Sequence, residues 1–174
     1  MFRPFFERDD RWENCLEEME SWMGTPYRHL KMTKGRGADC TLFLASIWKY
    51  CGVLTEVKYD YYSRDWYVHT NENLVMDSLV YHMRHCTAPG IAIVAQGRKD
   101  RDIFYRGDMI GFSFRENGIV NHAALWVGDY PKTKQTGQFI NCIDGAGGHG
   151  VCRMTYGSLW VPKTQIVLRV MEKV

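Results

Sequence analysis

Apolar residues recur at intervals of three and four early in the chain, which is the spacing of one face of an α-helix. One such face follows Asp9 and Asp10, which we expect to cap a helix that begins near Arg11. The residues on this face are Trp12, Cys15, Leu16, Met19, Trp22 and Met23. A second segment, from Asp39 to about Cys51, is apolar on all sides and is followed by a glycine. This pattern predicts a buried helix with a glycine stop.

The pattern changes in the second half of the chain. Thr70 is expected to cap a third helix that runs to about Cys86, and short β-like runs follow it. The expected strands are 91–95, 108–114, 122–127, 138–143, 151–154 and 165–171, with turns at 116–118, 129–132 and 145–150. Helices first and strands later predict an α+β domain, with N-terminal helices packed on a C-terminal antiparallel β-sheet. We expect residues 1–174 to form one such domain.

Composition narrows the classes of function. The 22 basic and 20 acidic residues leave a net charge of +2, which does not favour a nucleic-acid partner. No apolar run approaches the ~20 residues needed to span a bilayer, so no membrane partner is expected. The first ten residues lack the apolar stretch of a secretory signal, so the chain is expected to be cytoplasmic as synthesised. Six cysteines are too few for a disulfide scaffold, and we expect most of them to be buried thiols.

Two residues suggest chemistry beyond packing. Cys40 is the first or second residue of the buried helix, where the helix dipole is expected to lower the pKa of a thiol. The amide groups at that helix end are also suited to hold the oxyanion of a tetrahedral intermediate. His122 opens an expected strand and is a candidate base. By spacing alone, an ordinary buried thiol and a solvated histidine remain alternatives.

Several segments together resemble the NlpC/P60 family of cell-wall cysteine endopeptidases. Residues 22–27 and 37–43 are similar to its Gly-Thr-Pro-Tyr, a short loop, and then Asp-Cys-Ser-Gly-Phe. Residues 106–112 resemble its Pro-Gly-Asp-Leu strand, and residues 121–128 its Ser-His-Val-Gly-Ile-Tyr-Val-Gly. Residues 62–69 look like the linking segment of the phage and prophage branch.

The resemblance runs from about Glu18 to the end of the chain and implies a papain-like NlpC/P60 fold, with Cys40 as nucleophile and His122 as base. The implied substrate is the peptide stem of peptidoglycan, cut after D-γ-glutamate and before a diamino acid. In the family, the Asp before the nucleophile and the Tyr of Pro-Tyr help to bind the free amino end of the stem. Asp39 and Tyr27 hold those positions here, although Asp39 is equally suited to cap its helix.

Two positions depart from the family pattern. The residue after the cysteine is Thr41, which keeps a hydroxyl in the cleft, and we predict that it contacts substrate. The third polar residue of the family aligns with Asn141, whose amide oxygen can accept the imidazole N–H. Side chains alternate along a strand, so Asn141 is expected to point the same way as Phe139, toward the layer that holds the cysteine helix. Asp144 is the alternative orienting residue and otherwise a substrate-binding candidate.

The sequence gives only weak support for a metal site. A zinc site is conceivable from scattered residues, but their spacing is ragged and no C-x-x-C pair is present, so neither a metal nor another cofactor is expected. The residues concerned are His82, His85, Cys86, Cys142, His149 and Cys152.

Alternatives to cell-wall hydrolysis also stay open. One is a structural component of a phage tail or tail tip with weak catalysis, and such tail proteins are the candidate protein partners. The missing secretion signal fits a protein that a larger particle or another system delivers to the wall. Another is a related acyltransferase, but in that group the histidine usually precedes the cysteine, whereas Cys40 precedes His122.

Overall fold

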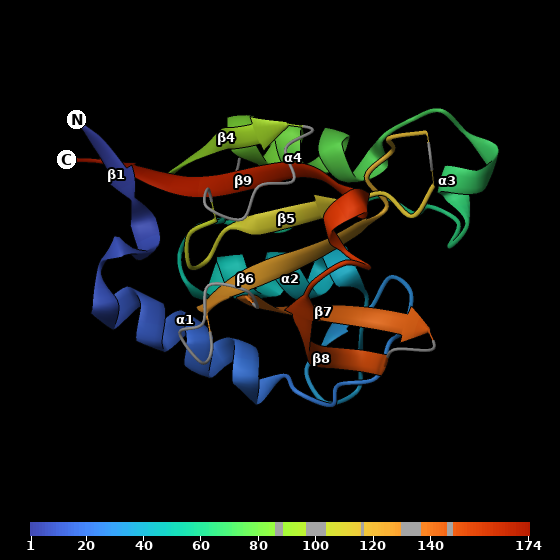
Figure 1. Cartoon of the computed structure of the whole chain (residues 1–174), viewed down its shortest axis with the longest axis horizontal. Helices are drawn as coiled ribbons and strands as arrows, with labels where there is room; N and C mark the ends of the chain where they lie inside the picture. The colour runs from blue at the N-terminus through green and yellow to red at the C-terminus, as the bar shows by residue number, and fades with distance from the viewer. Residues whose placement is uncertain (86–88, 97–103, 116, 130–136, 146–147) are drawn as a thin grey trace.

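The structure, a computed structural model, describes residues 1–174 except 86–88, 97–103, 116, 130–136 and 146–147. It confirms the expected α+β class, with helices mainly in the first half of the chain and a sheet mainly in the second (Figure 1). The α-helices are α1 (Asp9–Ser21), α2 (Cys40–Tyr50), α3 (Trp66–His69) and α4 (Leu74–His85), and 3₁₀ turns lie at η1 (Phe5–Glu7) and η3 (Val161–Lys163).

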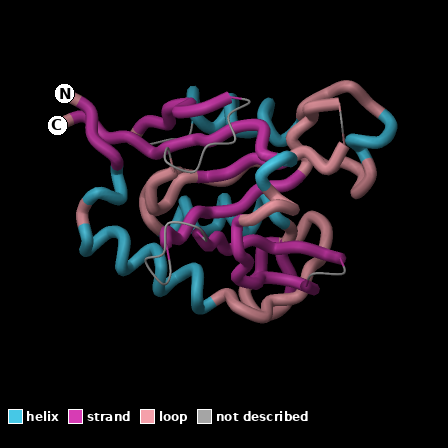
Figure 2. The backbone as a smooth tube through the Cα atoms, viewed as in Figure 1, coloured by secondary structure: helices cyan, strands magenta, loops and turns pink. Residues whose placement is uncertain are grey.

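The main sheet has seven strands, and all its pairings are antiparallel. Its order is β1-β9-β5-β6-β7-β8, and β4 also pairs with β9. These strands are β1 (Phe2–Pro4), β4 (Gly90–Gln96), β5 (Met109–Phe112), β6 (His122–Asp129), β7 (Gly137–Gly145), β8 (Gly148–Tyr156) and β9 (Thr164–Lys173). A small two-stranded sheet, β2 (Met32–Thr33) with β3 (Gly37–Ala38), directly precedes α2. Figure 2 shows the strands across the middle of the molecule with helices around them.

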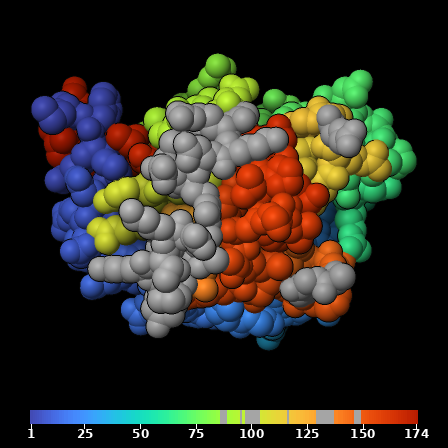
Figure 3. All heavy atoms as spheres, in the orientation of Figure 1, coloured from blue at the N-terminus to red at the C-terminus, as the bar shows by residue number. Residues whose placement is uncertain are grey.

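Side chains from the two faces of the sheet fill two separate cores. Ala123 and Leu125 of β6 belong to the larger core, together with buried residues of α1 and α2. Ala124 and Trp126, the alternate residues of the same strand, belong to a smaller core rich in aromatic rings. Because the strands are buried on both faces, their sequences read as continuous apolar runs rather than as a strict alternation. β8 and the residues that follow it form much of the centre of the surface in Figure 3, coloured orange to red.

The helix starts differ from the sequence expectation. α1 begins at Asp9, and its N-cap is Arg8, which makes no side-chain capping hydrogen bond. Asp9 and Asp10 therefore lie in the first turn, where their charges suit the helix dipole. The expected third helix is α4, which begins at Leu74, whereas Thr70 ends the short α3. Thr70 is thus a C-cap, and its predicted role as an N-cap is wrong.

Each of the six expected strands is present, most of them with different ends. β7 ends at Gly145 and β8 begins at Gly148, so four of the six residues expected in a turn at 145–150 lie in strands, and residues 146–147 lie outside the described residues. The expected turns at 116–118 and 129–132 fall partly outside the described residues. None of the helices in the described ranges is long and apolar enough to cross a bilayer.

Candidate active site

Cys40 is the first residue of α2, and the local sequence explains why the helix begins there. Asp39 has extended backbone angles and caps the helix, because its Oδ1 accepts a hydrogen bond from the Leu42 N–H at 2.8 Å. Its Oδ2 accepts one from the Leu30 N–H at 2.9 Å. Asp39 is 1% exposed, and through these two hydrogen bonds its carboxylate holds the loop before Cys40 as well as the start of the helix. The structure thus gives Asp39 the capping role, and its role in substrate binding stays a prediction.

His122 is the first residue of β6 and is buried against aromatic rings. Its imidazole lies 6.0 Å from the ring of Phe112, 5.4 Å from Phe114 and 5.9 Å from Trp160, measured between ring centroids. His122 and the half-buried Cys40 line one cavity of about 290 Å³. The structure therefore brings the two predicted catalytic residues to the same cavity, from two elements far apart in the sequence.

Asn141 contacts the imidazole of His122. The two strands pair so that Asn141 lies opposite Ala124, and Asn141 Oδ1 is 2.9 Å from His122 Nε2. The Nδ2 group of Asn141 donates to the carbonyl of Cys152 at 3.2 Å, which leaves Oδ1 to accept from the ring. Nε2 therefore carries the proton of the neutral imidazole, and Nδ1 is the nitrogen that is free to act as a base.

The contact between His122 and Asn141 lies on the other side of the sheet from the one predicted. Phe139, two residues before Asn141, packs in the smaller aromatic core, while Ile140 and Cys142 belong to the core that includes α2. Asn141 was expected to point toward the layer of the cysteine helix, and that part of the prediction is wrong. His122, stacked on Phe112, lies on the same side as Asn141. Cys40 and His122 line the same cavity, His122 from the first residue of β6.

Asp144, the alternative orienting residue, has other partners. Its Oδ1 lies 3.1 Å from Nδ1 of His149, and its Oδ2 accepts from the guanidinium of Arg64. Asp144 lines the cavity together with Tyr27 and Arg64. The carboxylate is thus part of the rim of the cavity, and the hydrogen bond to His122 belongs to Asn141.

Burial keeps the two reactive groups uncharged. Burial above all, and then the charge of Asp39, raise the pKa of the Cys40 thiol to about 12. The backbone N–H groups of Ala123, Thr41 and Cys40 itself oppose this rise. Burial lowers the pKa of His122 to about 4, against an opposing effect of the hydrogen bond that its ring donates to Asn141. The expected lowering by the helix terminus is therefore outweighed, and at neutral pH both the Cys40 thiol and the His122 imidazole are uncharged.

The other predicted substrate-binding residues lie at this cavity too. Tyr27, Asp39 and Thr41 all line it. The Thr41 hydroxyl lies 3.1 Å from Asp39 Oδ1 and 3.3 Å from the hydroxyl of Tyr62. Thr41 thus keeps its hydroxyl at the cavity, as predicted from the sequence.

Several residues of the cavity wall were not predicted as site residues, among them His29, Tyr62 and Arg64. His29 Nε2 lies 2.7 Å from the carbonyl oxygen of Tyr62, and the Arg64 guanidinium lies 5.4 Å from the centre of the Tyr27 ring. Tyr62 and Arg64 belong to the segment 62–69 that resembles the phage branch, which was the available signal. No group of three or more His, Cys, Asp or Glu side chains in the described part of the chain is placed to hold a metal ion.

Comparison with solved structures addresses the fold. A crystal structure of a protein similar to a lipoprotein, of the NLP/P60 family, from Staphylococcus aureus subsp. aureus Mu50 matches with a TM-score of 0.52. The match covers 96% of this chain at 18% sequence identity. This chain has an NlpC/P60-type fold. The match covers 43% of the Staphylococcus aureus protein, so the NlpC/P60-type fold corresponds to less than half of that longer chain. No family model matches the sequence, and no curated protein matches it either.

Proposed function

We propose that the protein is a cysteine hydrolase of the NlpC/P60 type that cleaves an amide bond. The observation that carries this proposal is the shared cavity of Cys40 and His122, with the imidazole held by Asn141 at 2.9 Å. A thiol at a helix N-terminus, a base and a residue that orients the base are the parts that acyl transfer to sulfur requires. The NlpC/P60-type fold adds support, because the matching protein belongs to that family.

The neutral resting pair determines the order of events. Nδ1 of His122 takes the thiol proton as the Cys40 sulfur attacks the substrate carbonyl, so charge develops only as the reaction proceeds. The backbone N–H groups that lie against the sulfur are well placed to donate to the oxyanion. The imidazolium then gives its proton to the leaving amine, which releases one product and leaves a thioester on Cys40. Water, deprotonated by the same imidazole, cleaves the thioester and restores the thiol.

The proposed substrate is the peptide stem of peptidoglycan, cleaved after D-γ-glutamate and before a diamino acid. Tyr27, Thr41 and Asp144 line the cavity and are the proposed contacts to the stem. Asp39, with both oxygens engaged in the protein, would contribute its negative charge to the binding of a free amino end. We further propose that a phage tail or another delivery system brings the protein to the wall.

The test uses purified stem peptides derived from muropeptides, L-alanyl-D-γ-glutamyl-diaminopimelyl-D-alanine with a free amino end, and products are identified by mass spectrometry. We expect the wild-type protein to release L-alanyl-D-glutamate and the remaining diaminopimelyl peptide. Cys40→Ala is the matched control, because it removes the sulfur and leaves the fold and the cavity in place. Unchanged masses with folded wild-type protein, or equal cleavage by Cys40→Ala, would show that the proposal is wrong.

A further inference from the structure

Three charged side chains other than histidines line the Cys40 cavity in the described part of the chain: Asp39, Arg64 and Asp144. Asp39 is buried, and each of its oxygens accepts a hydrogen bond from a backbone N–H group. The oxygens of Asp144 are also engaged, Oδ2 by the guanidinium of Arg64 and Oδ1 by the ring of His149. Arg64 is therefore the cation through which this cavity can recognise a charged group of a ligand.

Arg64 has hydrogen-bond donors that no described residue uses. A guanidinium carries five N–H donors in one plane. Within the described ranges, Arg64 donates from Nη2 to Asp144, and its Nε and Nη1 groups have no acceptor. The side chain is 61% exposed, so a ligand at the rim of the cavity can reach it.

Two contacts fix the position of the guanidinium. Asp144, near the end of β7, binds Nη2, and Cζ of Arg64 lies over the Tyr27 ring at 5.4 Å from its centre. A guanidinium that is already held loses less conformational freedom on binding a ligand than a free one does. Its planar pairs of N–H groups match the two oxygens of a carboxylate. The arrangement therefore suits a carboxylate of the ligand.

Arg64 lies on one side of the proposed scissile bond. In the proposed function, the charge of Asp39 attracts the free amino end of the stem, so the acyl part of the substrate lies near Asp39. Tyr27 pairs with Ala38, the residue before Asp39, and Arg64 lies over Tyr27. Arg64 is thus on the acyl side, where the residue that contributes the scissile carbonyl is bound.

The acyl part of the proposed substrate carries one carboxylate. Cleavage after D-γ-glutamate means that this glutamate is linked through its side-chain carboxyl group, which leaves its α-carboxylate free. Three carbon atoms separate that carboxylate from the scissile carbonyl. The L-alanine before it contributes an amine and no carboxylate. The α-carboxylate of the glutamate is therefore the group that Arg64 can bind.

We propose that Arg64 is a specificity-determining residue that binds the free α-carboxylate of D-glutamate in the stem. The protein then prefers a stem with this carboxylate over one in which it is a carboxamide, as in D-isoglutamine. A carboxamide has no charge and a single acceptor oxygen, so it cannot take two N–H groups as a carboxylate does. The inference rests on the proposed function, because it names a determinant of the proposed substrate.

Titration calorimetry on the folded Cys40→Ala protein tests the inference without any need for cleavage. The probes are L-alanyl-D-γ-glutamyl-diaminopimelyl-D-alanine and the same peptide with D-isoglutamine in place of D-glutamate. The carboxylate form is expected to bind about tenfold more tightly, in the range for a charge-assisted hydrogen bond near the surface. Adding Arg64→Gln should weaken binding of the carboxylate form about tenfold and leave the carboxamide form unchanged.

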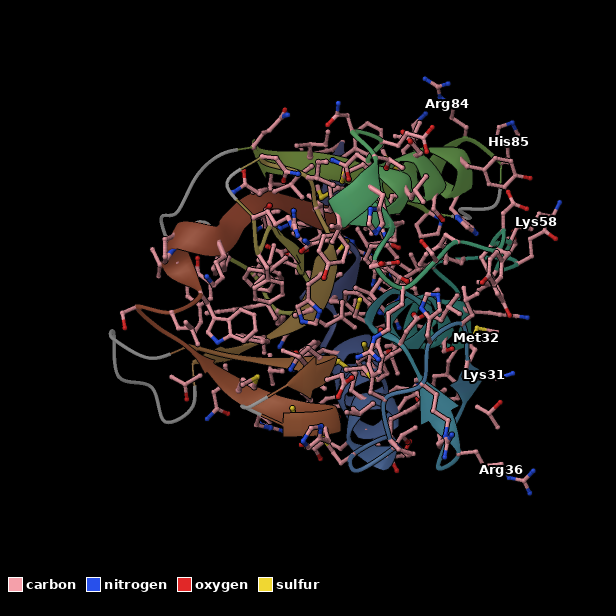
Figure 4. All side chains as sticks on the ribbon, turned by 90° about the vertical axis from the view of Figure 1, so that its right-hand side faces the viewer. Lys31, Met32, Arg36, Lys58, Arg84 and His85 are labelled. Carbon is pink, nitrogen blue, oxygen red and sulfur yellow. The ribbon has the colours of Figure 1, made fainter. Side chains whose placement is uncertain are left out.

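Arg36→Gln is the matched control, because Arg36 is exposed and projects outward in Figure 4, and it should keep the tenfold preference. Equal affinity of the Cys40→Ala protein for the two peptides, no detectable binding of either at millimolar concentration, or a preference that survives Arg64→Gln would overturn the inference.

Cleavage of the same two peptides by wild-type protein separates this inference from the proposed function. Equal kcat/KM for the two peptides means that the protein is a hydrolase and that the role of Arg64 is wrong. Cleavage of neither peptide, together with an Arg64-dependent preference in binding, means that Arg64 recognises the carboxylate and that the hydrolase proposal is wrong.

Discussion

Two histidines at the candidate active site each contact one side chain at nearly the same distance, but one contact is buried and the other is exposed to solvent. His122 Nε2 lies 2.9 Å from Asn141 Oδ1, and both residues are buried. His149 Nδ1 lies 3.1 Å from Asp144 Oδ1, and the side chain of His149 is 78% exposed. Water solvates the exposed pair, whereas aromatic rings surround the buried one.

The difference explains why the buried contact uses an amide. A carboxylate next to His122 would favour the imidazolium and would itself need solvation that the aromatic surroundings do not provide. Asn141 fixes the ring and its proton without adding a charge, so the imidazole stays a free base. Asp144 lies at the surface, where water solvates its charge and the guanidinium of Arg64 pairs with it. The position in the fold therefore decides which histidine can serve as the base.

The largest expected effect is the difference in activity between the variants His122→Ala and His149→Ala. His122→Ala removes the base, so kcat/KM for muropeptide cleavage should fall on the order of 10³-fold. His149→Ala should stay within about twofold of wild type, because general-base catalysis does not involve that ring. Steady-state rates measured by chromatography of the products make the comparison. A larger loss in His149→Ala than in His122→Ala would reverse the assignment.

The buried histidine should also make the stability depend on pH. His122 has a pKa of about 4 in the folded protein and about 6.5 when unfolded, so the unfolded chain binds more protons between these values. Stability is therefore expected to fall as the pH falls from 6.5 to 4, by about 3 kcal/mol in total. Urea unfolding across this range measures the effect.

The matched variant for that measurement is His122→Gln, which does not titrate and can still donate to Asn141. It should lose this part of the pH dependence, while His149→Gln should retain it. Identical pH profiles for His122→Gln and wild type would contradict the burial argument.

Asn141 contacts the ring of His122, and Asp144 contacts the ring of His149. Replacing Asn141 should therefore lower activity more than replacing Asp144, although less than replacing His122. Asn141→Ala frees the imidazole of His122 to rotate, so kcat should fall by about one to two orders of magnitude while KM changes little. Asp144→Ala should leave kcat unchanged and act, if at all, on KM. Michaelis–Menten kinetics separate these cases, with thermal unfolding as the check that Asn141→Ala is folded. A loss of kcat confined to Asp144→Ala would make the aspartate the orienting residue.

The smallest effect concerns the rim of the cavity. The pair of Arg64 with Asp144 is exposed at the arginine, whose side chain is 61% accessible, so water and salt screen it. Arg64→Ala should change the free energy of unfolding by less than about 1 kcal/mol. Chemical denaturation at low and high salt tests this. Lys34→Ala, which removes the partner of Glu18, serves for comparison, because the Lys34 side chain is 41% accessible. A loss of several kcal/mol would mean that the rim is structural.

Local signals in the sequence were enough to predict most of the fold. The helix of Cys40 follows from its apolar run and the Asp39 cap, and these two features do not depend on distant parts of the chain. The contact of Asn141 with His122 was also predicted, because a resemblance supplied the pairing of strands that periodicity alone does not give.

Quantities that depend on the assembled protein could not be predicted in this way. The pKa of Cys40 reflects the loss of water around its sulfur in the packed domain, which outweighs the local effect of the helix terminus. The face on which Asn141 lies could not be predicted, because the sheet has a core on both sides and the sequence does not show which core Phe139 and Asn141 point toward. Tyr62 and Arg64 reach the cavity only through the path of the chain after α2.

The neutral thiol of Cys40 has a consequence for the lifetime of the protein outside a reducing environment. Hydrogen peroxide and disulfides react with the thiolate, and sulfinic or sulfonic acids, once formed, are not ordinarily reduced again. A thiol whose pKa lies at about 12 presents almost no thiolate at neutral pH, so oxidants have little to attack. If Cys40 is the nucleophile, as proposed, its sulfur is expected to oxidise slowly in air while no substrate is bound.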